Sequence, residues 1–134
     1  MMNRLANTKN PYQGKFKKVL AVCSAGLLRS PSIAWVLSNP PYECNTRACG
    51  VSSEYALIPI DQVLVEWADV IVCADEDHMP VVMKLREQCE DPKKPVWNLQ
   101  IPDRYSMRHP ALVTAIQERL AALDFKSFLS DLQK

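Results

Sequence analysis

A cysteine and an arginine separated by five residues stand near the start of this chain, in the segment 23–30 that reads CSAGLLRS. The planar guanidinium of Arg29 can bind two oxygens of a tetrahedral oxyanion, a geometry that a lysine cannot copy. The positive environment of such a loop favours the thiolate form of Cys23, which is the nucleophilic form. The spacing therefore indicates a phosphate-binding loop in which Cys23 is the attacking group.

The residues between Cys23 and Arg29 would supply the rest of the anion site. Successive N–H groups of a loop that enters a helix can turn inward around an anion, and the helix N-terminus adds a partial positive charge. Gly26 permits a backbone conformation that a β-carbon resists, and the Ser30 hydroxyl can donate a hydrogen bond to the thiolate. The residues expected around the anion are Ser24, Ala25, Gly26, Leu27, Leu28 and Arg29. Spacing alone also allows a buried thiol beside a surface arginine.

Strands and helices must position this loop. Along the chain, short continuous apolar runs alternate with segments whose apolar residues recur at helical spacing. Short apolar segments predict buried strands at 19–22, 43–51, 69–74 and 95–99. Between and after them, Ser30 and Pro31 predict the N-cap and first residue of a helix that ends near Asn39. Asp75, Glu76 and Asp77 favour the N-terminus of another helix. The residues expected on buried helical faces are Ile33, Val36, Leu37, Ile60, Val63, Leu64, Trp67, Val82, Met83, Leu85, Cys89, Leu112, Val113, Ile116, Leu120 and Leu123.

Alternating strands and helices predict an α/β three-layer sandwich, with a central four-stranded parallel sheet and helices on both faces. Ligands of such sheets bind outside the carboxyl ends of the strands. The loops that follow Val22, Ala74 and Leu99 should therefore meet at one edge, with Cys23 among them.

Length and composition are those of one globular domain. The chain has 134 residues and a formal net charge of +1, so no general field favours nucleic acid or an anionic membrane. Residues 1–15 read as a flexible N-terminal arm and 16–134 as the domain. The start of the chain lacks the apolar stretch of an export signal, and five cysteines cannot all pair with one another. We therefore expect reduced thiols in a cytoplasmic protein.

The segment 22–31 resembles the phosphate-binding loop of the low-molecular-weight protein tyrosine phosphatases, whose signature is Cys-x5-Arg-Ser/Thr. Three further segments resemble the same family: 47–50, 67–72 and 101–103, which read RACG, WADVIV and IPD. The resemblance covers about residues 18 to 125. It implies hydrolysis of phosphate monoesters through a phosphocysteine intermediate, without a metal or other cofactor, on a phosphorylated protein or small ester.

The same resemblance implies that Asp103 is the general acid, although a group near His109, before Pro110, is an alternative. Arg104 and Tyr105 follow Asp103 where the family has proline and aromatic residues, and Ala25, Gly26 and Leu28 also differ from its common loop. Leu28 stands where many members carry a second cysteine. Tyr105 and Tyr55 are candidates for the wall of the substrate entrance, and each could instead be an exposed loop residue.

Other interpretations use the same residues differently. An arsenate reductase shares this fold and loop, and it would need Cys73 or Cys89 as a resolving thiol for Cys23. A module that only binds phosphate or phosphotyrosine would need no acid. The run 75–78, which reads DEDH, is more typical of a solvated helix cap than of a metal site. Cys44, Cys49, Cys73 and Cys89 are most simply small buried hydrophobic residues.

Overall fold

The computed structural model describes residues 17–23, 29–40, 42–51, 58–101 and 110–132. The arm predicted at residues 1–15 lies outside this part of the chain. No helix among the described residues is long and apolar enough to cross a membrane.

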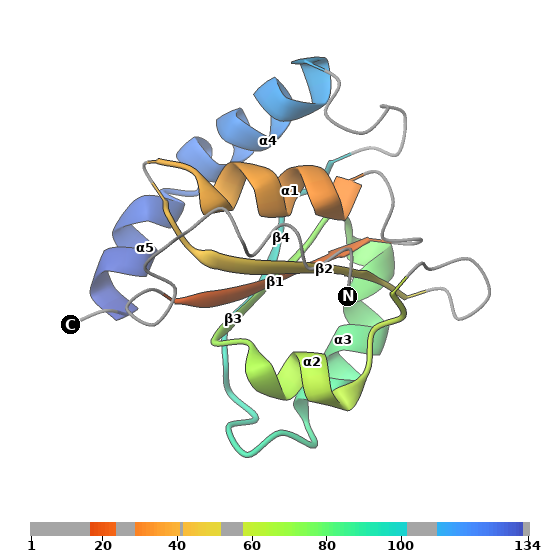
Figure 1. Cartoon of the computed structure of the whole chain (residues 1–134). Helices are drawn as coiled ribbons and strands as arrows, with labels where there is room; N and C mark the ends of the chain where they lie inside the picture. The colour runs from red at the N-terminus through yellow and green to blue at the C-terminus, as the bar shows by residue number, and fades with distance from the viewer. Residues whose placement is uncertain (1–16, 24–28, 41, 52–57, 102–109, 133–134) are drawn as a thin grey trace.

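A parallel sheet forms the middle layer of the described part of the chain (Figure 1). Its strands are β1 (Lys18–Cys23), β2 (Asn45–Gly50), β3 (Val70–Cys73) and β4 (Val96–Asn98), in the order β2-β1-β3-β4. Each neighbouring pair is parallel. The two central strands are buried on both faces, β1 from Val19 to Cys23 and β3 throughout, which is why their sequences are continuously apolar. The predicted four-stranded sheet is confirmed.

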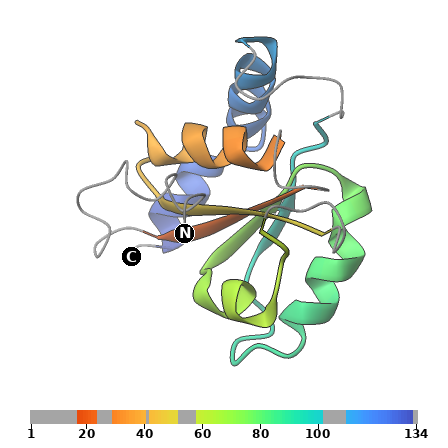
Figure 2. The ribbon, with the colours of Figure 1, turned by 45° about the vertical axis from the view of Figure 1, so that its right-hand side comes forward.

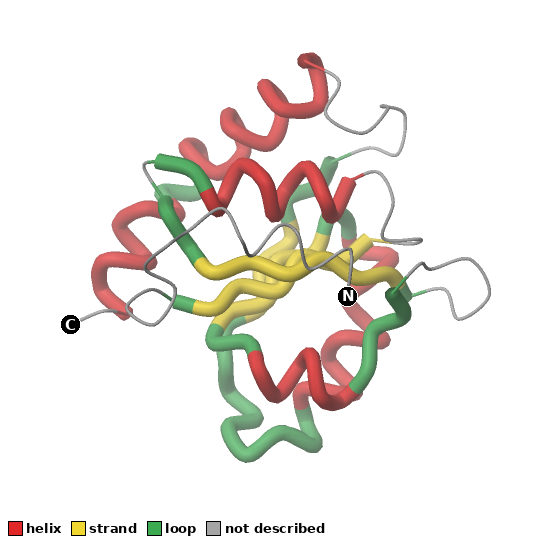
Figure 3. Tube along the Cα trace, viewed as in Figure 1, coloured by secondary structure: helices red, strands yellow, loops and turns green. Residues whose placement is uncertain are grey.

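Helices cover both faces of this sheet (Figures 1 and 2). The helices α1 (Arg29–Ser38), α4 (Pro110–Ala122) and α5 (Phe125–Leu132) lie on one side. On the other side lie α2 (Gln62–Trp67), the short 3-10 helix η3 (Glu76–His78) and α3 (Met79–Arg86). Coloured by element type, the strands form a layer between two groups of helices (Figure 3). The three-layer α/β fold predicted from the sequence is therefore confirmed.

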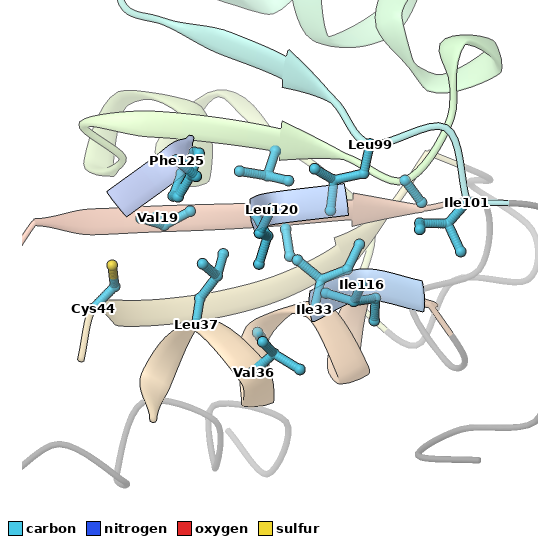
Figure 4. Packing of buried hydrophobic residues seen from close by; sticks show 14 of the residues in the cluster. Val19, Ile33, Val36, Leu37, Cys44, Leu99, Ile101, Ile116, Leu120 and Phe125 are labelled. Carbon is cyan, nitrogen blue, oxygen red and sulfur yellow. The ribbon is translucent and has the colours of Figure 1, made fainter. Parts of the chain in front are cut away.

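Side-chain alternation along β1 divides the interior into two cores. Val19, Ala21 and Cys23 pack into the core under α1, α4 and α5 (Figure 4), which also contains Ile33, Leu37, Leu112, Ile116, Leu120 and Phe125. Leu20 and Val22 pack into the second core, which also contains Cys49, Leu64, Val65, Ile71, Cys73, Val82 and Cys89. This period of two is the geometry of a strand that is buried on both faces.

The prediction for α2 is wrong at two residues, because Ile60 lies before the helix and Val63 is 73% exposed. Asp61 is the N-cap of this helix, and its carboxylate accepts a hydrogen bond of 2.8 Å from the Leu64 N–H. The cap sets the helical phase so that Leu64 and Val65 face the sheet. In a helix of only six residues, this local bond decides which side chains are buried.

Two further helical predictions hold in part. In α3 only Val82 is fully buried, whereas Met83 and Leu85 are half-buried and Cys89 is buried beyond the helix end. The last predicted helix ends at Ala122, so Leu123 lies just beyond it, and Asp124 has a left-handed φ of 55° between α4 and α5. The break lets Phe125 turn into the core, where its ring meets Trp97 edge-on at a centroid distance of 5.1 Å.

Candidate functional site

The carboxyl ends of three strands meet at one edge, as the sequence predicted. Backbone pairing continues past the strand ends: the Ala74 N–H donates to the Val22 carbonyl at 2.8 Å, and the Ile101 N–H donates to the Ala74 carbonyl at 2.7 Å. On the other side of β1, the Val51 N–H donates to the Cys23 carbonyl at 2.9 Å. These bonds place the carboxyl ends of β1, β3 and β4 beside one another and fix Cys23 at the centre of the edge.

Cys23 is buried, and its thiol lies against the first turn of α1. The Sγ donates to Ser30 Oγ at 3.1 Å, and Ser30 Oγ donates to the Cys49 carbonyl, also at 3.1 Å. A hydroxyl has one proton and rotates freely about its C–O bond. When Cys23 loses its proton, the Ser30 hydroxyl can turn from the Cys49 carbonyl to the sulfur. The contact is therefore suited to stabilising a thiolate at this position.

Ser30 is not the N-cap that the sequence suggested, and Pro31 is not the first helical residue. The helix α1 begins at Arg29, so both lie inside its first turn. The Ser30 side chain is fully buried and uses its oxygen on Cys23 and Cys49. Ser-Pro is a common signature of a helix start, but here the tertiary contact with Cys23 determines where the hydroxyl points.

Arg29 is buried at the same edge, with 4% of its surface exposed. Its Nη1 donates to the Ile101 carbonyl at 2.8 Å, and its Nη2 lies 3.5 Å from His78 Nε2. Removing a guanidinium from water costs several kcal/mol unless hydrogen bonds and opposite charge offset the loss. A buried arginine beside the end of β1 is therefore well suited to binding an anion, and it also contacts the segment that leads to Asp103.

The segment before Asp103 is itself held by α4. Gln100 has a left-handed φ of 57°, which turns the chain sharply between Leu99 and Ile101. Arg119 spans this turn, since its Nε donates to the Leu99 carbonyl at 2.8 Å and its Nη2 to Gln100 Oε1 at 3.0 Å. The Ile101 carbonyl is thereby presented to Arg29 from a fixed position.

His78 is a site residue that the sequence analysis missed. Its side chain is 1% exposed, and its Nδ1 accepts a 3.2 Å hydrogen bond from the Asp75 N–H, which completes a capping box at η3. Burial and the nearby Arg29 charge lower the pKa of His78, against the opposing effects of Asp75 and Asp77. The sequence predicts a solvated helix cap at residues 75–78. Asp75 does cap η3, but the His78 side chain is buried and lies next to Arg29. The one signal in the sequence for His78 is its position after β3, at the edge where ligands are expected.

The lowered pKa of His78 predicts an acid-side loss of stability. The unfolded chain takes up a proton near the ordinary imidazole pKa of about 6.5, before the folded chain does. Stability is therefore present above this pH and is lost as the pH falls through it toward the folded-state pKa. The variant His78→Asn cannot titrate, and its amide oxygen can still accept from the Asp75 N–H. We expect thermal unfolding midpoints measured from pH 8 to about pH 5 to fall more steeply for wild type than for His78→Asn. Parallel curves would contradict this.

The other cysteines are buried free thiols, as predicted. Burial raises the pKa of Cys44 and Cys73 to about 12 and also raises the pKa of Cys49 and Cys89. Cys73 and Cys89 pack in the core beneath α2 and α3, whereas Cys23 packs on the opposite face of the sheet. The sheet thus separates Cys23 from both candidate resolving thiols, which argues against the arsenate reductase alternative.

Several predicted site residues lie outside the part of the chain that the structure describes. They are Ser24, Ala25, Gly26, Leu27, Leu28, Tyr55, Asp103, Tyr105 and His109. Within the described ranges, no group of three or more His, Cys, Asp or Glu side chains could hold a metal ion. The described residues that the fold brings together are Cys23, Arg29, Ser30 and His78, with the Ile101 carbonyl.

Solved structures define the class of fold to which this arrangement belongs. Vibrio vulnificus Wzb in complex with benzylphosphonate superimposes with a TM-score of 0.61 and 20% sequence identity, over 83% of this chain and 99% of that one. The YwlE arginine phosphatase from Geobacillus stearothermophilus gives a TM-score of 0.57 and 17% identity, over 87% of this chain and 93% of that one. No family model and no curated protein sequence matches this chain.

Both structures are low-molecular-weight protein tyrosine phosphatase family members. The resemblance that the sequence motifs indicated is therefore confirmed at the level of the fold. At these identities the comparison concerns the fold alone, and the chemistry has to be argued from the residues of this chain.

Proposed function

We propose that this chain is a cysteine-dependent phosphatase that hydrolyses phosphate monoesters through a phosphocysteine intermediate. The observation that carries the proposal is the joint placement of Cys23, Ser30 and Arg29 at the carboxyl edge of the sheet, with a hydroxyl on the sulfur and a buried guanidinium nearby. This edge is where ligands of parallel sheets bind. The fold shared with two phosphatase-family structures supports the same conclusion.

In the first step the Cys23 thiolate attacks phosphorus in line with the leaving oxygen. A sulfur–phosphorus bond forms while the phosphorus–oxygen bond of the ester breaks. Arg29 and the backbone N–H groups of residues 24–28 stabilise the charge on the equatorial oxygens. Asp103 donates its proton to the leaving oxygen, which departs as an alcohol or phenol.

In the second step water attacks the phosphocysteine. The Asp103 carboxylate accepts a proton from the water, as microscopic reversibility requires, and the sulfur–phosphorus bond breaks. Inorganic phosphate leaves, the thiolate returns to its hydrogen bond with Ser30, and Asp103 is again protonated. Each step uses groups of this chain and water. Because the thiolate must stay reduced, a reducing compartment such as the cytoplasm suits this chemistry.

A panel of phosphate esters, with phosphoarginine as a compound that has a phosphorus–nitrogen bond, narrows the substrate class. Tyr105 and Tyr55 are proposed to form the entrance and would favour aryl esters through ring stacking. The panel contains p-nitrophenyl phosphate, alkyl phosphates, a phosphotyrosine peptide and phosphoarginine. The last two are included because one similar structure binds benzylphosphonate and the other is named an arginine phosphatase. We expect release of inorganic phosphate and, after acid quenching, one phosphoryl group on Cys23 by mass spectrometry. Absence of both for every substrate would reject the proposed function.

The substitution Asp103→Asn tests the identity of the acid. An amide cannot donate the proton, so the loss depends on how much the leaving oxygen needs it. We expect the rate with an alkyl phosphate to fall by about 10²–10⁴-fold, and the rate with p-nitrophenyl phosphate to fall much less. The measurement is kcat/KM, which reports formation of the phosphocysteine and not its hydrolysis, for a series of esters of increasing leaving-group pKa, with His109→Asn as the matched control. Equal losses across the series would assign the acid elsewhere, and a steeper dependence in His109→Asn would assign it to that histidine.

A further inference from the structure

The contact between Arg29 and His78 has a consequence for anion recognition that deepens the proposed function and rests on it. Both side chains are buried, with 4% and 1% of their surfaces exposed. They come from different elements, Arg29 from the start of α1 and His78 from η3 after β3. The Nη2 and Nε2 atoms lie 3.5 Å apart. A second residue thus stands beside the guanidinium that is proposed to hold the phosphate.

The hydrogen bond at the other ring nitrogen determines the tautomer of His78. Burial and the Arg29 charge lower the pKa of the ring, so the imidazole is neutral at neutral pH and carries a single proton. The two contacts of the ring require different tautomers, because the Asp75 N–H donates to Nδ1 at 3.2 Å, whereas Arg29 Nη2 at 3.5 Å could donate only to an unprotonated Nε2. The shorter bond, at Nδ1, assigns the proton to Nε2. At Nε2 the ring is therefore a donor, and a second donor, Arg29 Nη2, lies next to it.

Two neighbouring donors of this kind match one anionic oxygen. An oxygen about 2.9 Å from each nitrogen completes a triangle on the 3.5 Å base, and an oxyanion oxygen has lone pairs for both bonds. A guanidinium and an N–H dipole repel each other at this distance, and an anionic oxygen bound between them offsets that repulsion.

We propose that His78 is a second oxyanion-binding side chain, whose Nε2–H donates to the same phosphate oxygen as Arg29 Nη2. The hydrogen bond from the Asp75 N–H to Nδ1 selects the donor tautomer, so the capping box of η3 and the anion site depend on one ring. The Arg29 Nη1, which donates to the Ile101 carbonyl, keeps the guanidinium in place while Nη2 binds.

Two substitutions separate the two nitrogens of the ring. His78→Asn can retain an acceptor near the Nδ1 position but has no group near Nε2. His78→Gln can place an amide N–H near the Nε2 position but loses the acceptor for the Asp75 N–H. The probe is inorganic phosphate, and its dissociation constant is measured by calorimetry at neutral pH on the full, reduced chain. The thermal unfolding midpoint of each protein is measured in the absence of phosphate.

We expect a crossed result. His78→Asn should unfold near the wild-type temperature and bind phosphate about 10-fold more weakly or worse, the loss typical of one hydrogen bond to a charged group. His78→Gln should unfold at a lower temperature but keep an affinity within about 3-fold of wild type, since its donor remains. Wild-type affinity in His78→Asn would overturn the proposal. The proposal would also be overturned if the phosphate affinity of the two variants fell in proportion to their thermal stability, or if the wild-type chain did not bind phosphate.

These outcomes are distinct from failure of the proposed function. A wild-type chain that binds phosphate through His78 but hydrolyses no ester would reject the enzyme and leave this site standing. A wild-type chain that hydrolyses esters, with His78→Asn binding phosphate as well as wild type, would reject this site and leave the enzyme standing.

Discussion

Replacing Cys23 by serine should reduce turnover of p-nitrophenyl phosphate by roughly 10⁴-fold or more, the scale seen when a nucleophile is removed. The hydroxyl that replaces the thiol is far less acidic, so the attacking anion is absent at neutral pH. The fold should persist, because the new side chain is nearly the same size and its hydroxyl can bond with Ser30 as the thiol does. Initial rates, the thermal unfolding midpoint and phosphate affinity together check the prediction.

The matched control is Cys44→Ala, which removes another buried thiol far from the site. Cys44 directly precedes β2, whose first residue pairs with Lys18, whereas Cys23 pairs with Gly50 at the other end of that strand. Figure 4 shows Cys44 and Ile101 at opposite ends of the same core. We expect Cys44→Ala to unfold at a slightly lower temperature and to keep wild-type kcat. Full activity in Cys23→Ser would show that Cys23 is not the nucleophile. If Cys23→Ser and Cys44→Ala lost the same fraction of kcat, the loss would come from a general disturbance of the core and not from the missing nucleophile.

The fold was predictable because its signals are local. Continuous apolar runs at β1 and β3 identify strands that are buried on both faces, and the intervening periodicity identifies helices. Parallel strands joined in this order bring their carboxyl ends to one edge, so the sequence alone predicts that Cys23 lies there. The exposed position of Val63 was not predictable from periodicity alone, because the Asp61 cap sets the phase of so short a helix.

Only the part of the site that depends on residue type and spacing within one segment could be predicted from the sequence. Cys23 and Arg29 belong to one motif, and the structure places both at the expected edge. The direction of the Ser30 hydroxyl depends on β2, which supplies the Cys49 carbonyl. The meeting of His78 with Arg29 joins residues 49 positions apart, and in the sequence this histidine resembles the end of a solvated acidic run. The contact forms where the residues after β3 and the first residue of α1 meet at the carboxyl edge of the sheet, and it has no local signature.

The substitution Arg29→Lys should lower kcat/KM for p-nitrophenyl phosphate by about 10²–10³-fold, the range observed when one donor to a developing oxyanion is lost. The variant keeps the positive charge, so the loss reports geometry. The planar guanidinium bonds the Ile101 carbonyl through Nη1 and presents Nη2 beside His78. A lysine has a single ammonium nitrogen on a flexible stem and cannot occupy both positions. Steady-state kinetics and inorganic phosphate affinity measure the effect, and both should fall.

Arg86→Lys is the control that matches this change in chemistry. Arg86 is another arginine whose Nη1 donates to a backbone carbonyl, that of Lys94 at 3.2 Å, but it lies on α3, away from the carboxyl edge. Losing this bond should lower the unfolding temperature slightly and leave kcat/KM at the wild-type value. If Arg29→Lys were as active as Arg86→Lys, positive charge alone would suffice at the site. A role for the fixed guanidinium plane would then have to be abandoned, because the difference between the two variants isolates the contribution of that plane to binding the transferring phosphoryl group.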